Sequence, residues 1–555
     1  MRLSRVLWGA GAGGGLALAL WFGSSVPGFS ERSSFTLTEL STRLGFRFTP
    51  PEPGARRVDG VRAEIVEASA VAPSGEAADP QGSVRVASLG AVNVVDPGAS
   101  AVAPVVTTPA EPPSADHLHP SHYLGALSKE TPIHEKPSTR STILGFARTG
   151  SLLRRAELAK GHDGCKEGWY RVEPEGYVCV NKAATLDMEH PLLQLASFQP
   201  DRSLPLPYVY GRSRYPTPPF YTRIPTDAEQ AQAEQDLTGH RKKNFGEKWQ
   251  EHADTAPPIL LEKGERIPRP YGYPRLEREF MTGRALTNSA FAFIDLFESG
   301  GRQWGLTADL SLLPLDRLTI VEPSQFSGLI LAGDTLPVAF VRSETQQLYR
   351  RDEASGAFAL VRPIAYRESF VLTGRRERSG QGVFLETKSG EFLRENDRLV
   401  RIEPKEKLPK WATGKRSWID VSILRQTLVA YEGPTPVFAT LVSTGRDGIQ
   451  DPETTHSTVQ GVYLIHTKHV TATMSGDEAD DEFDLRDVPY VQYFHEGYAF
   501  HAAFWHDGYG GPRSHGCINL SPSDARYLFT WTDPPVPQRW HSALSRSGTL
   551  VYIHP

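Results

Sequence analysis

The sequence predicts a mainly β, multidomain protein. Its 555 residues correspond to about two to four domains if one domain has about 150 residues. After residue 123, short stretches of alternating apolar and polar residues recur between Gly, Pro and Asp turns, which is typical of strands. Before residue 123 the chain is rich in Ala, Pro, Ser and Gly, a composition that does not favour a folded domain.

The first 30 residues predict an export signal or a membrane anchor. Arg2 and Arg5 precede an apolar stretch at 6–22, and no charged residue occurs from Val6 to Ser30. A positive segment followed by an apolar one is the pattern of export signals, whereas the glycines in this stretch would make a poor buried helix. A removed signal and a retained anchor both stay open, because the stretch is at the lower limit for spanning a bilayer. The expected location is the periplasm or cell envelope, with membrane contact only through this segment.

Residues 31–122 predict a disordered linker. No aromatic residue occurs between Phe48 and Tyr123, so this stretch lacks the apolar surface that folding requires. The formal net charge of the chain is −5, which argues against a nucleic-acid partner because such proteins present a basic face.

Residues 123–190 predict a small β module. The stretch "GWYRVEPEGYVCV" (168–180) resembles the bacterial SH3-like modules of cell-wall enzymes, and an unrelated small β domain is the alternative. Cys165 and Cys179 lie fourteen residues apart across a predicted turn. In an oxidising compartment they could form a disulfide, and two reduced core cysteines are the alternative.

The middle of the chain predicts an irregular segment followed by more strands. Residues 191–285 are rich in Pro and Tyr, and we expect them to wrap on neighbouring domains or to bind glycans. One helix is expected there, opened by Pro225 and Thr226 and closed by Gly239. Residues 286–405 predict one or two β modules, since two strand–turn–strand stretches both end in Asp-Arg-Leu, at 316–318 and 397–399.

Residues 415–553 predict a β-rich domain that carries the chemistry. Alternating apolar residues from Ser417 onward predict hairpins, Ser521 or Ser523 can cap a short helix, and "GTLVYIHP" predicts a closing strand. Cys517 precedes this helix and lies near several histidines. A thiol activated by imidazole, beside a glycine that lets backbone N–H groups approach an oxyanion, suits acyl transfer through a thioester.

Two other readings of Cys517 compete with catalysis. A lone cysteine is often a small buried apolar residue. A zinc ion could also be bound by the cysteine with the nearby histidines, His495, His501, His506 and His515. No HExxH motif and no paired CxxC spacing supports the zinc reading, and no metal or cofactor is predicted.

The motif around Cys517 resembles the signature of the YkuD-type L,D-transpeptidase family. This signature is a histidine followed, after a variable gap, by Ser/Thr-His-Gly-Cys-x-Asn/Arg. Here twelve residues separate His501 from "SHGCIN" (514–519). "LVSTG" (441–445) is similar to the family's Ser-Thr-Gly strand end. "TVQGVYLI" (458–465) is similar to its Thr-Pro-x-Gly-x-Phe element, with Val459 and Gln460 replacing the expected Pro-x.

The resemblance implies a role for each motif residue. Cys517 would be the nucleophile and His501 its base, oriented by the backbone carbonyl of Ala502. His515 and Ser514 match supporting positions, and the N–H groups of Gly516 and Cys517 would form the oxyanion hole. Asn519 also matches a supporting position and is a candidate for contacting the substrate. Two residues outside the family match are further candidates: Arg513 could pair with a stem-peptide carboxylate or be a solvated arginine, and Trp505 could be a wall of the site or a core tryptophan.

The resemblance also implies the substrate. Family members act on peptidoglycan stem peptides: the enzyme attacks the third residue of a tetrapeptide, releases D-alanine and passes the acyl group to an amine. The product is a 3→3 cross-link or a tethered protein. An L,D-carboxypeptidase that uses water, and a peptidoglycan-binding scaffold with an idle catalytic domain, are the alternatives.

The acidic stretch "GDEADDEFDLRD" (476–487) is a further feature of this domain. It is either a solvated loop or an acidic lid that attracts the ammonium group of an acceptor, because clustered charge raises the local concentration of cations.

Overall fold

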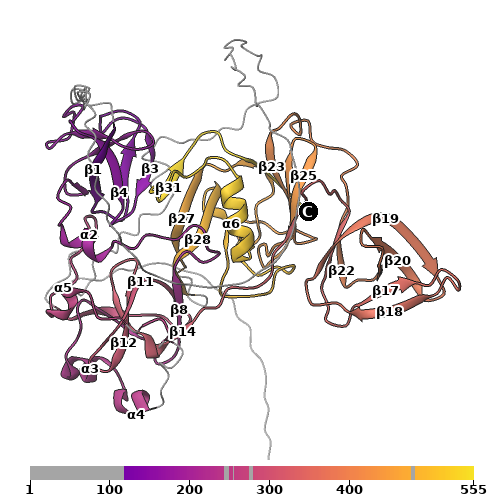
Figure 1. Ribbon diagram of the computed structural model, residues 1–555, viewed down its shortest axis with the longest axis horizontal. Helices are drawn as coiled ribbons and strands as arrows, with labels where there is room; N and C mark the ends of the chain where they lie inside the picture. Colours follow the sequence, from indigo (N-terminus) through magenta and orange to yellow (C-terminus); the bar gives the residue numbers. More distant parts are fainter. Residues whose placement is uncertain (1–117, 243–248, 250, 254, 274–278, 477–481) are drawn as a thin grey trace, which may run out of the picture. The chain divides into compact units, whose positions relative to one another are not determined.

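The computed structural model describes residues 118–555 except 243–248, 250, 254, 274–278 and 477–481, and it is built mainly of strands (Figure 1). The predicted mainly β class is therefore confirmed. The predicted export segment and the linker up to residue 117 lie outside the described residues. Within the part described, no helix has the length and apolar character needed to cross a bilayer.

The first described region is a small β module. Its first strand begins at Leu118, so the last five residues of the predicted linker belong to a strand. β1 pairs with β4 and β7 in a three-stranded sheet. The strands are β1 (Leu118–Ala126), β2 (Thr131–His134), β3 (Ile143–Ala147), β4 (Leu152–Ala156), β5 (Trp169–Arg171), β6 (Tyr177–Cys179) and β7 (Ala184–Thr185). The likeness of this region to SH3-like modules stays a prediction.

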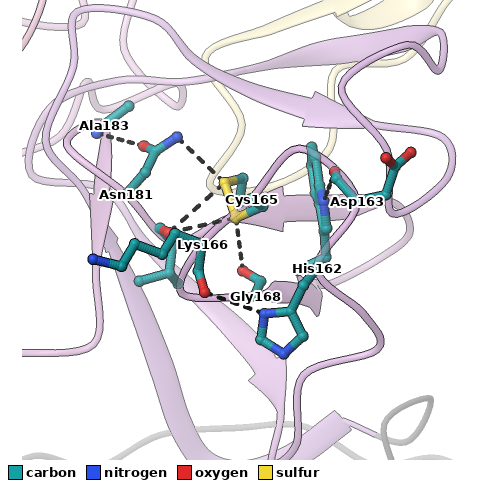
Figure 2. The surroundings of a disulfide bond; sticks show 10 residues. His162, Asp163, Cys165, Lys166, Gly168, Asn181 and Ala183 are labelled. Atoms are coloured by element: carbon teal, nitrogen blue, oxygen red, sulfur yellow. Dashed lines mark hydrogen bonds between the residues drawn. A yellow bond between two sulfur atoms is a disulfide. The ribbon is translucent and has the colours of Figure 1, made fainter.

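A disulfide joins Cys165 and Cys179 in this module (Figure 2). Both residues are buried beside Trp169, and Asn181 Nδ2 donates a hydrogen bond to Cys179 Sγ (3.3 Å). The bond ties the loop before β5 to the end of β6. Cys517 is the free cysteine of the chain.

Residues 191–320 contain short helices and a set of strands. The helices are α2 (Pro191–Leu195), α3 (Asp227–Ala233), α4 (Leu237–Lys242), α5 (Ile259–Glu262) and η2 (Leu315–Arg317). The strands are β8 (Val209–Ser213), β9 (Pro219–Tyr221), β10 (Met281–Arg284), β11 (Ala290–Ser299), β12 (Arg302–Thr307), β13 (Leu312–Pro314) and β14 (Leu318–Ile320).

The single helix expected from 225 to 239 is two helices. Thr226 is the N-cap of α3 and forms a capping box with Glu229, in agreement with the expected start. The helix ends at Ala233 because the side chain of Glu234 is buried in an ion pair with Arg302 and Arg317. The second helix, α4, then includes Gly239, which was expected to close the first.

Residues 338–402 form a seven-stranded sheet of their own, called here the 338–402 module. Its strands are β16 (Val338–Val341), β17 (Gln347–Arg351), β18 (Phe358–Pro363), β19 (Ser369–Ser379), β20 (Gly382–Thr387), β21 (Phe392–Arg394) and β22 (Leu399–Ile402). The two similar stretches seen in the sequence lie in different sheets: one contains β12–β13, the other β20–β21. Their turns are nevertheless alike, since Thr307 and Thr387 each bond, by backbone and hydroxyl, to the residue four positions on.

The C-terminal region contains the expected hairpins, helix and closing strand. The elements are β23 (Ser417–Ser422), β24 (Thr427–Glu432), β25 (Thr435–Leu441), β26 (Gly461–Leu464), β27 (Thr467–Gly476), β28 (Phe483–His495), β29 (Tyr498–Ala502), β30 (Ile518–Leu520), α6 (Pro522–Trp531), β31 (Ser542–Leu544) and β32 (Leu550–His554). Ser521 is the N-cap of α6. A six-stranded sheet takes in β23–β26, β32 and the short strand β15 (Leu329–Ile330).

The long hairpin β27–β28 lies at the centre of a larger, 16-stranded sheet. β31 joins it to β3, through the pair Gly145–Ala543, and β28 pairs in parallel with β11 at Leu485–Ala290. Figure 1 shows α6 (yellow) against β27 and β28. The hairpin that leads into the predicted site is thus continuous with strands from two earlier regions of the chain.

Candidate active site

His501 and Cys517 come together through a parallel strand pair. β29 pairs with β30 so that His501 lies opposite Asn519 and Phe500 opposite Ile518. Cys517 directly precedes β30, and the backbone N–H of Ala499 hydrogen-bonds its thiol. Because directly opposite residues of a strand pair point to the same face, His501 and Asn519 share one face of the sheet, and Cys517 ends the bend that leads into β30.

The Cys517 thiol is half-buried and protonated at rest. Its Sγ lies 3.6 Å from the carbonyl oxygen of Gly497. Burial raises the pKa of the thiol to about 11, an effect that the hydrogen bond from Ala499 partly offsets. The side chain therefore needs a base to become a nucleophile at neutral pH.

His501 is a neutral imidazole, and one of its ring nitrogens already forms a hydrogen bond. The side chain is 2% exposed, and burial lowers its pKa to about 4, against the opposing effect of the Ala502 carbonyl. Nδ1 donates its hydrogen to that carbonyl (3.3 Å), which leaves Nε2 with a free lone pair. The ring of Trp505 stacks on the imidazole at 5.6 Å. The arrangement can accept a proton at Nε2.

Backbone bonds to the "LVSTG" strand end hold the motif in place. Ser443 and Asn519 exchange two backbone hydrogen bonds (2.8 and 3.0 Å), and Ser514 N–H donates to the Thr444 carbonyl. The Thr458 hydroxyl donates to the carbonyl of Gly516 at 2.7 Å. The two stretches that resemble family elements thus contact the cysteine motif directly.

Gly516 has a conformation that excludes a side chain. Its φ is +117°, and an added Cβ would lie 2.6 Å from the Tyr498 ring. Its N–H donates to Ser514 Oγ (3.1 Å), and that hydroxyl donates to the Cys517 carbonyl. An oxyanion at this N–H would have to replace the Ser514 contact, so the role predicted for Gly516 stays a prediction.

Asn519 contacts His506 beneath the site. Gly508 N–H donates to His506 Nδ1 (3.2 Å), so the neutral ring carries its hydrogen on Nε2, 3.0 Å from the Asn519 amide. The Asn519 oxygen accepts this hydrogen when the amide is turned over, which also gives a partner to the otherwise unpaired Oδ1. Burial and the charge of Arg513 lower the pKa of His506 to about 4.

His515 and Arg513 lie at the surface of the site. The His515 ring is exposed and contacts Phe483 and His456, with Arg446 NH1 3.3 Å from its Nε2. The Arg513 guanidinium covers Gly508. The roles predicted for both residues stay predictions.

The acidic stretch is described only at its ends. Asp484 pairs with Arg486, and Asp487 pairs with Arg148 in a buried contact. Both of these carboxylates are engaged by arginines, and the acidic-lid hypothesis stays a prediction. Residues 477–481 lie outside the described part.

The described histidines around Cys517 do not form a metal-binding group. Within the described ranges, one set of potential ligands lies close enough to share an ion, namely His119, His122 and Glu157 in the first β module. The two imidazole rings there stack at 3.8 Å, so their lone pairs lie side by side and do not converge. The geometry gives no support to the zinc reading of the Cys517 motif.

Residues 416–553 match the YkuD family, the L,D-transpeptidase catalytic domain. The predicted resemblance of this region is therefore confirmed. A comparison with curated proteins found no match.

Solved structures similar to this chain include three L,D-transpeptidases. A mutant of Enterococcus faecium L,D-transpeptidase is 23% identical over 25% of this chain and 50% of that chain, with a TM-score of 0.20. L,D-transpeptidase from Stackebrandtia nassauensis is 25% identical over 27% and 62%, at 0.19. L,D-transpeptidase from Mycobacterium smegmatis is 17% identical over 43% and 100%, at 0.21. The chain thus spans half the length of the first of these proteins.

Several residues of the site carried no recognisable sequence signal. Tyr498 packs on Gly516, His506 contacts Asn519, and Arg446 with His456 lies beside His515. The sequence indicated His506 only as a possible zinc ligand. Thr458, by contrast, could be found from the sequence, because it is the first residue of the element that resembles the family's Thr-Pro-x-Gly-x-Phe.

Proposed function

We propose that the chain is a peptidoglycan L,D-transpeptidase of the cell envelope that passes a stem-peptide acyl group through Cys517 to an amine. The observation that carries the proposal is the match of residues 416–553 to the L,D-transpeptidase catalytic domain. It is supported by the pairing of β29 with β30, which brings the strand that begins after Cys517 alongside His501. The family acts on peptidoglycan stem peptides, which are the proposed donor.

Acylation begins with a neutral thiol and a neutral imidazole. Cys517 Sγ attacks the carbonyl carbon of the third residue of a tetrapeptide while its proton passes to His501 Nε2. The Ala502 carbonyl holds Nδ1–H and so stabilises the imidazolium that forms. The peptide C–N bond then breaks, and D-alanine leaves with the proton from His501.

Deacylation reverses these roles. An acceptor amine attacks the thioester carbonyl, gives its proton to His501, and Sγ leaves and takes that proton back. We propose that the backbone N–H groups of Cys517 and Gly516 donate hydrogen bonds to the oxyanion in both steps. The Gly516 N–H must first break its hydrogen bond to Ser514 Oγ. A cross-linked peptide or a tethered protein results.

The test mixes the full-length protein with a purified disaccharide-tetrapeptide and follows products by mass spectrometry. Cys517→Ala is the matched control, because Ala leaves the backbone unchanged and removes the sulfur. Cross-linked dimers that have lost D-alanine, absent with the control, would support the proposal. Tripeptide alone would mean that water is the acceptor and that the protein is an L,D-carboxypeptidase. No product and no acyl adduct on Cys517 would favour the scaffold alternative.

A further inference from the structure

The loop between the two proposed catalytic residues is held from outside its own domain. This loop, residues 503–513, is called here the His–Cys loop. At its centre, Asp507 binds Arg367, which belongs to the turn between β18 and β19 of the 338–402 module. Arg367 lies outside the residues that match the catalytic domain family.

Arg367 and Asp507 are joined by several hydrogen bonds. Both terminal nitrogens of the guanidinium bind the carboxylate, and NH1 also donates to the Asp507 backbone carbonyl at 3.0 Å. A two-pronged contact of this kind fixes orientation as well as distance. The hydroxyl of Ser324, in the segment that precedes the 338–402 module, donates a hydrogen bond to the same carboxylate.

Arg367 is itself held rigidly. The residue is 9% exposed, and its guanidinium lies over the rings of Tyr366, Phe326 and Tyr509 at 4.8, 5.1 and 5.7 Å. Its φ is +64°, a left-handed conformation that costs a non-glycine residue energy and often marks a functional position. The Arg367 N–H donates to the Val341 carbonyl of β16 (2.6 Å), which connects this turn to the sheet of the module.

Residues on both sides of Asp507 contact the site. Trp505 stacks on His501, His506 contacts Asn519, and the Gly508 carbonyl accepts a hydrogen bond from the Ser443 hydroxyl. A displacement of Asp507 would therefore also move Trp505, whose ring stacks on His501, and His506, which contacts the Asn519 amide.

We propose that Arg367 is a positioning residue for acyl transfer: by binding Asp507 it keeps the His–Cys loop in the conformation in which Trp505 and His506 hold His501 and Asn519. The 338–402 module is on this account part of the working active site. The inference rests on the proposed function for the roles of His501 and Cys517, and its geometry does not depend on which acceptor is used.

The test compares variants of the full-length protein by two measurements. Arg367→Met removes the guanidinium, Arg367→Lys keeps the charge but not the two-pronged contact, and Asp507→Asn changes the partner. Arg362→Met is the matched control, since Arg362 is an exposed arginine of the same module that pairs with Glu368. One measurement is donor turnover; the other is alkylation of Cys517 by iodoacetamide at neutral pH, which needs no peptidoglycan. Both rates are expressed per mole of folded protein.

We expect Arg367→Met to lower kcat about tenfold to a hundredfold with little change in KM, since small displacements of a catalytic group cost rates of this order. Cys517 alkylation should slow in the same variant, Arg367→Lys should recover part of both losses, and Arg362→Met should match the parent protein. The double variant Arg367→Met/Asp507→Asn should be no slower than the slower single one, because the two side chains act through one contact.

The two ideas fail in different ways. Folded Arg367→Met and Asp507→Asn proteins with the turnover and alkylation rates of the parent would overturn the role of Arg367. A parent that turns over no donor, but whose alkylation slows in these variants and not in Arg362→Met, would overturn the proposed function and leave the positioning role standing. Should Arg367→Met not fold, Asp507→Asn and Arg367→Lys decide the question in the same way.

Discussion

Arg148 and Asp487 form a buried ion pair although 339 residues separate them in the chain. The same guanidinium donates to the Thr471 hydroxyl (2.9 Å) and to the Ala308 carbonyl (3.0 Å). One arginine thus connects the first β module, the β12–β13 turn and the β27–β28 hairpin. Asp487 lies in the hairpin that leads into β29 and the proposed base.

We expect Asp487→Asn to destabilise the protein by about 3–5 kcal/mol, since it leaves the Arg148 charge buried without its partner. The pairing lowers the pKa of Asp487 to about 2 despite its burial. This contribution to stability is therefore present above the ordinary carboxyl pKa and is lost as the pH falls through about 2. Urea unfolding across the acid range measures both effects. Asp163→Asn, in the exposed pair with Arg140, is the control, and an equal loss there would contradict the prediction.

The proposed acyl transfer should be active over a broad pH range. Burial lowers the pKa of His501 to about 4 and raises that of Cys517 to about 11. The imidazole is therefore a free base above about pH 4, and the thiol keeps its proton until about pH 11. We expect kcat/KM to fall on the acid side near pH 4 and to stay level through neutrality. An acid limb near the ordinary histidine pKa would mean that His501 is solvated in the working enzyme.

Gly516→Ala should abolish most of the activity. The new Cβ would have to displace the Tyr498 ring and would sit at a φ of +117°, which moves the backbone next to Cys517. Gly511→Ala, in the preceding His–Cys loop, is the control, because its Cβ would meet no atom closer than 3.8 Å. We expect Cys517 acylation, followed by mass spectrometry, to fall more than about tenfold in the first variant and to be unchanged in the second. Equal rates would show that the turn tolerates a side chain.

Loss of the disulfide should loosen the first β module and leave the proposed chemistry intact. The Cys165–Cys179 bond closes a loop of about 15 residues, which corresponds to about 3 kcal/mol in the chain-entropy model. The double variant Cys165→Ser/Cys179→Ser should be cut faster by protease within this module while Cys517 alkylation is unchanged. Thiol titration of the unfolded, non-reduced protein should find Cys517 alone, and two additional thiols would show that the bond is not formed in the cell.

Local patterns in the sequence predicted local structure well. The strands from Ser417 onward follow from alternation, and Ser521 caps α6 because a cap depends on residues three positions away. The end of the helix that begins after Thr226 could not be predicted, since Glu234 leaves the helix to pair with Arg302 and Arg317, about 70 to 80 residues further on.

The sequence by itself determined the mainly β class, because strands follow from local alternation of apolar and polar residues. It also determined the family that residues 416–553 resemble and the candidate nucleophile and base, because these depend on short sequence motifs. Only the tertiary structure decided which distant side chains meet. Arg367 reaches Asp507 across 140 residues and Arg148 reaches Asp487 across 339. Such contacts join segments that are far apart in the chain, and the local sequence around an arginine does not indicate which distant carboxylate it will bind.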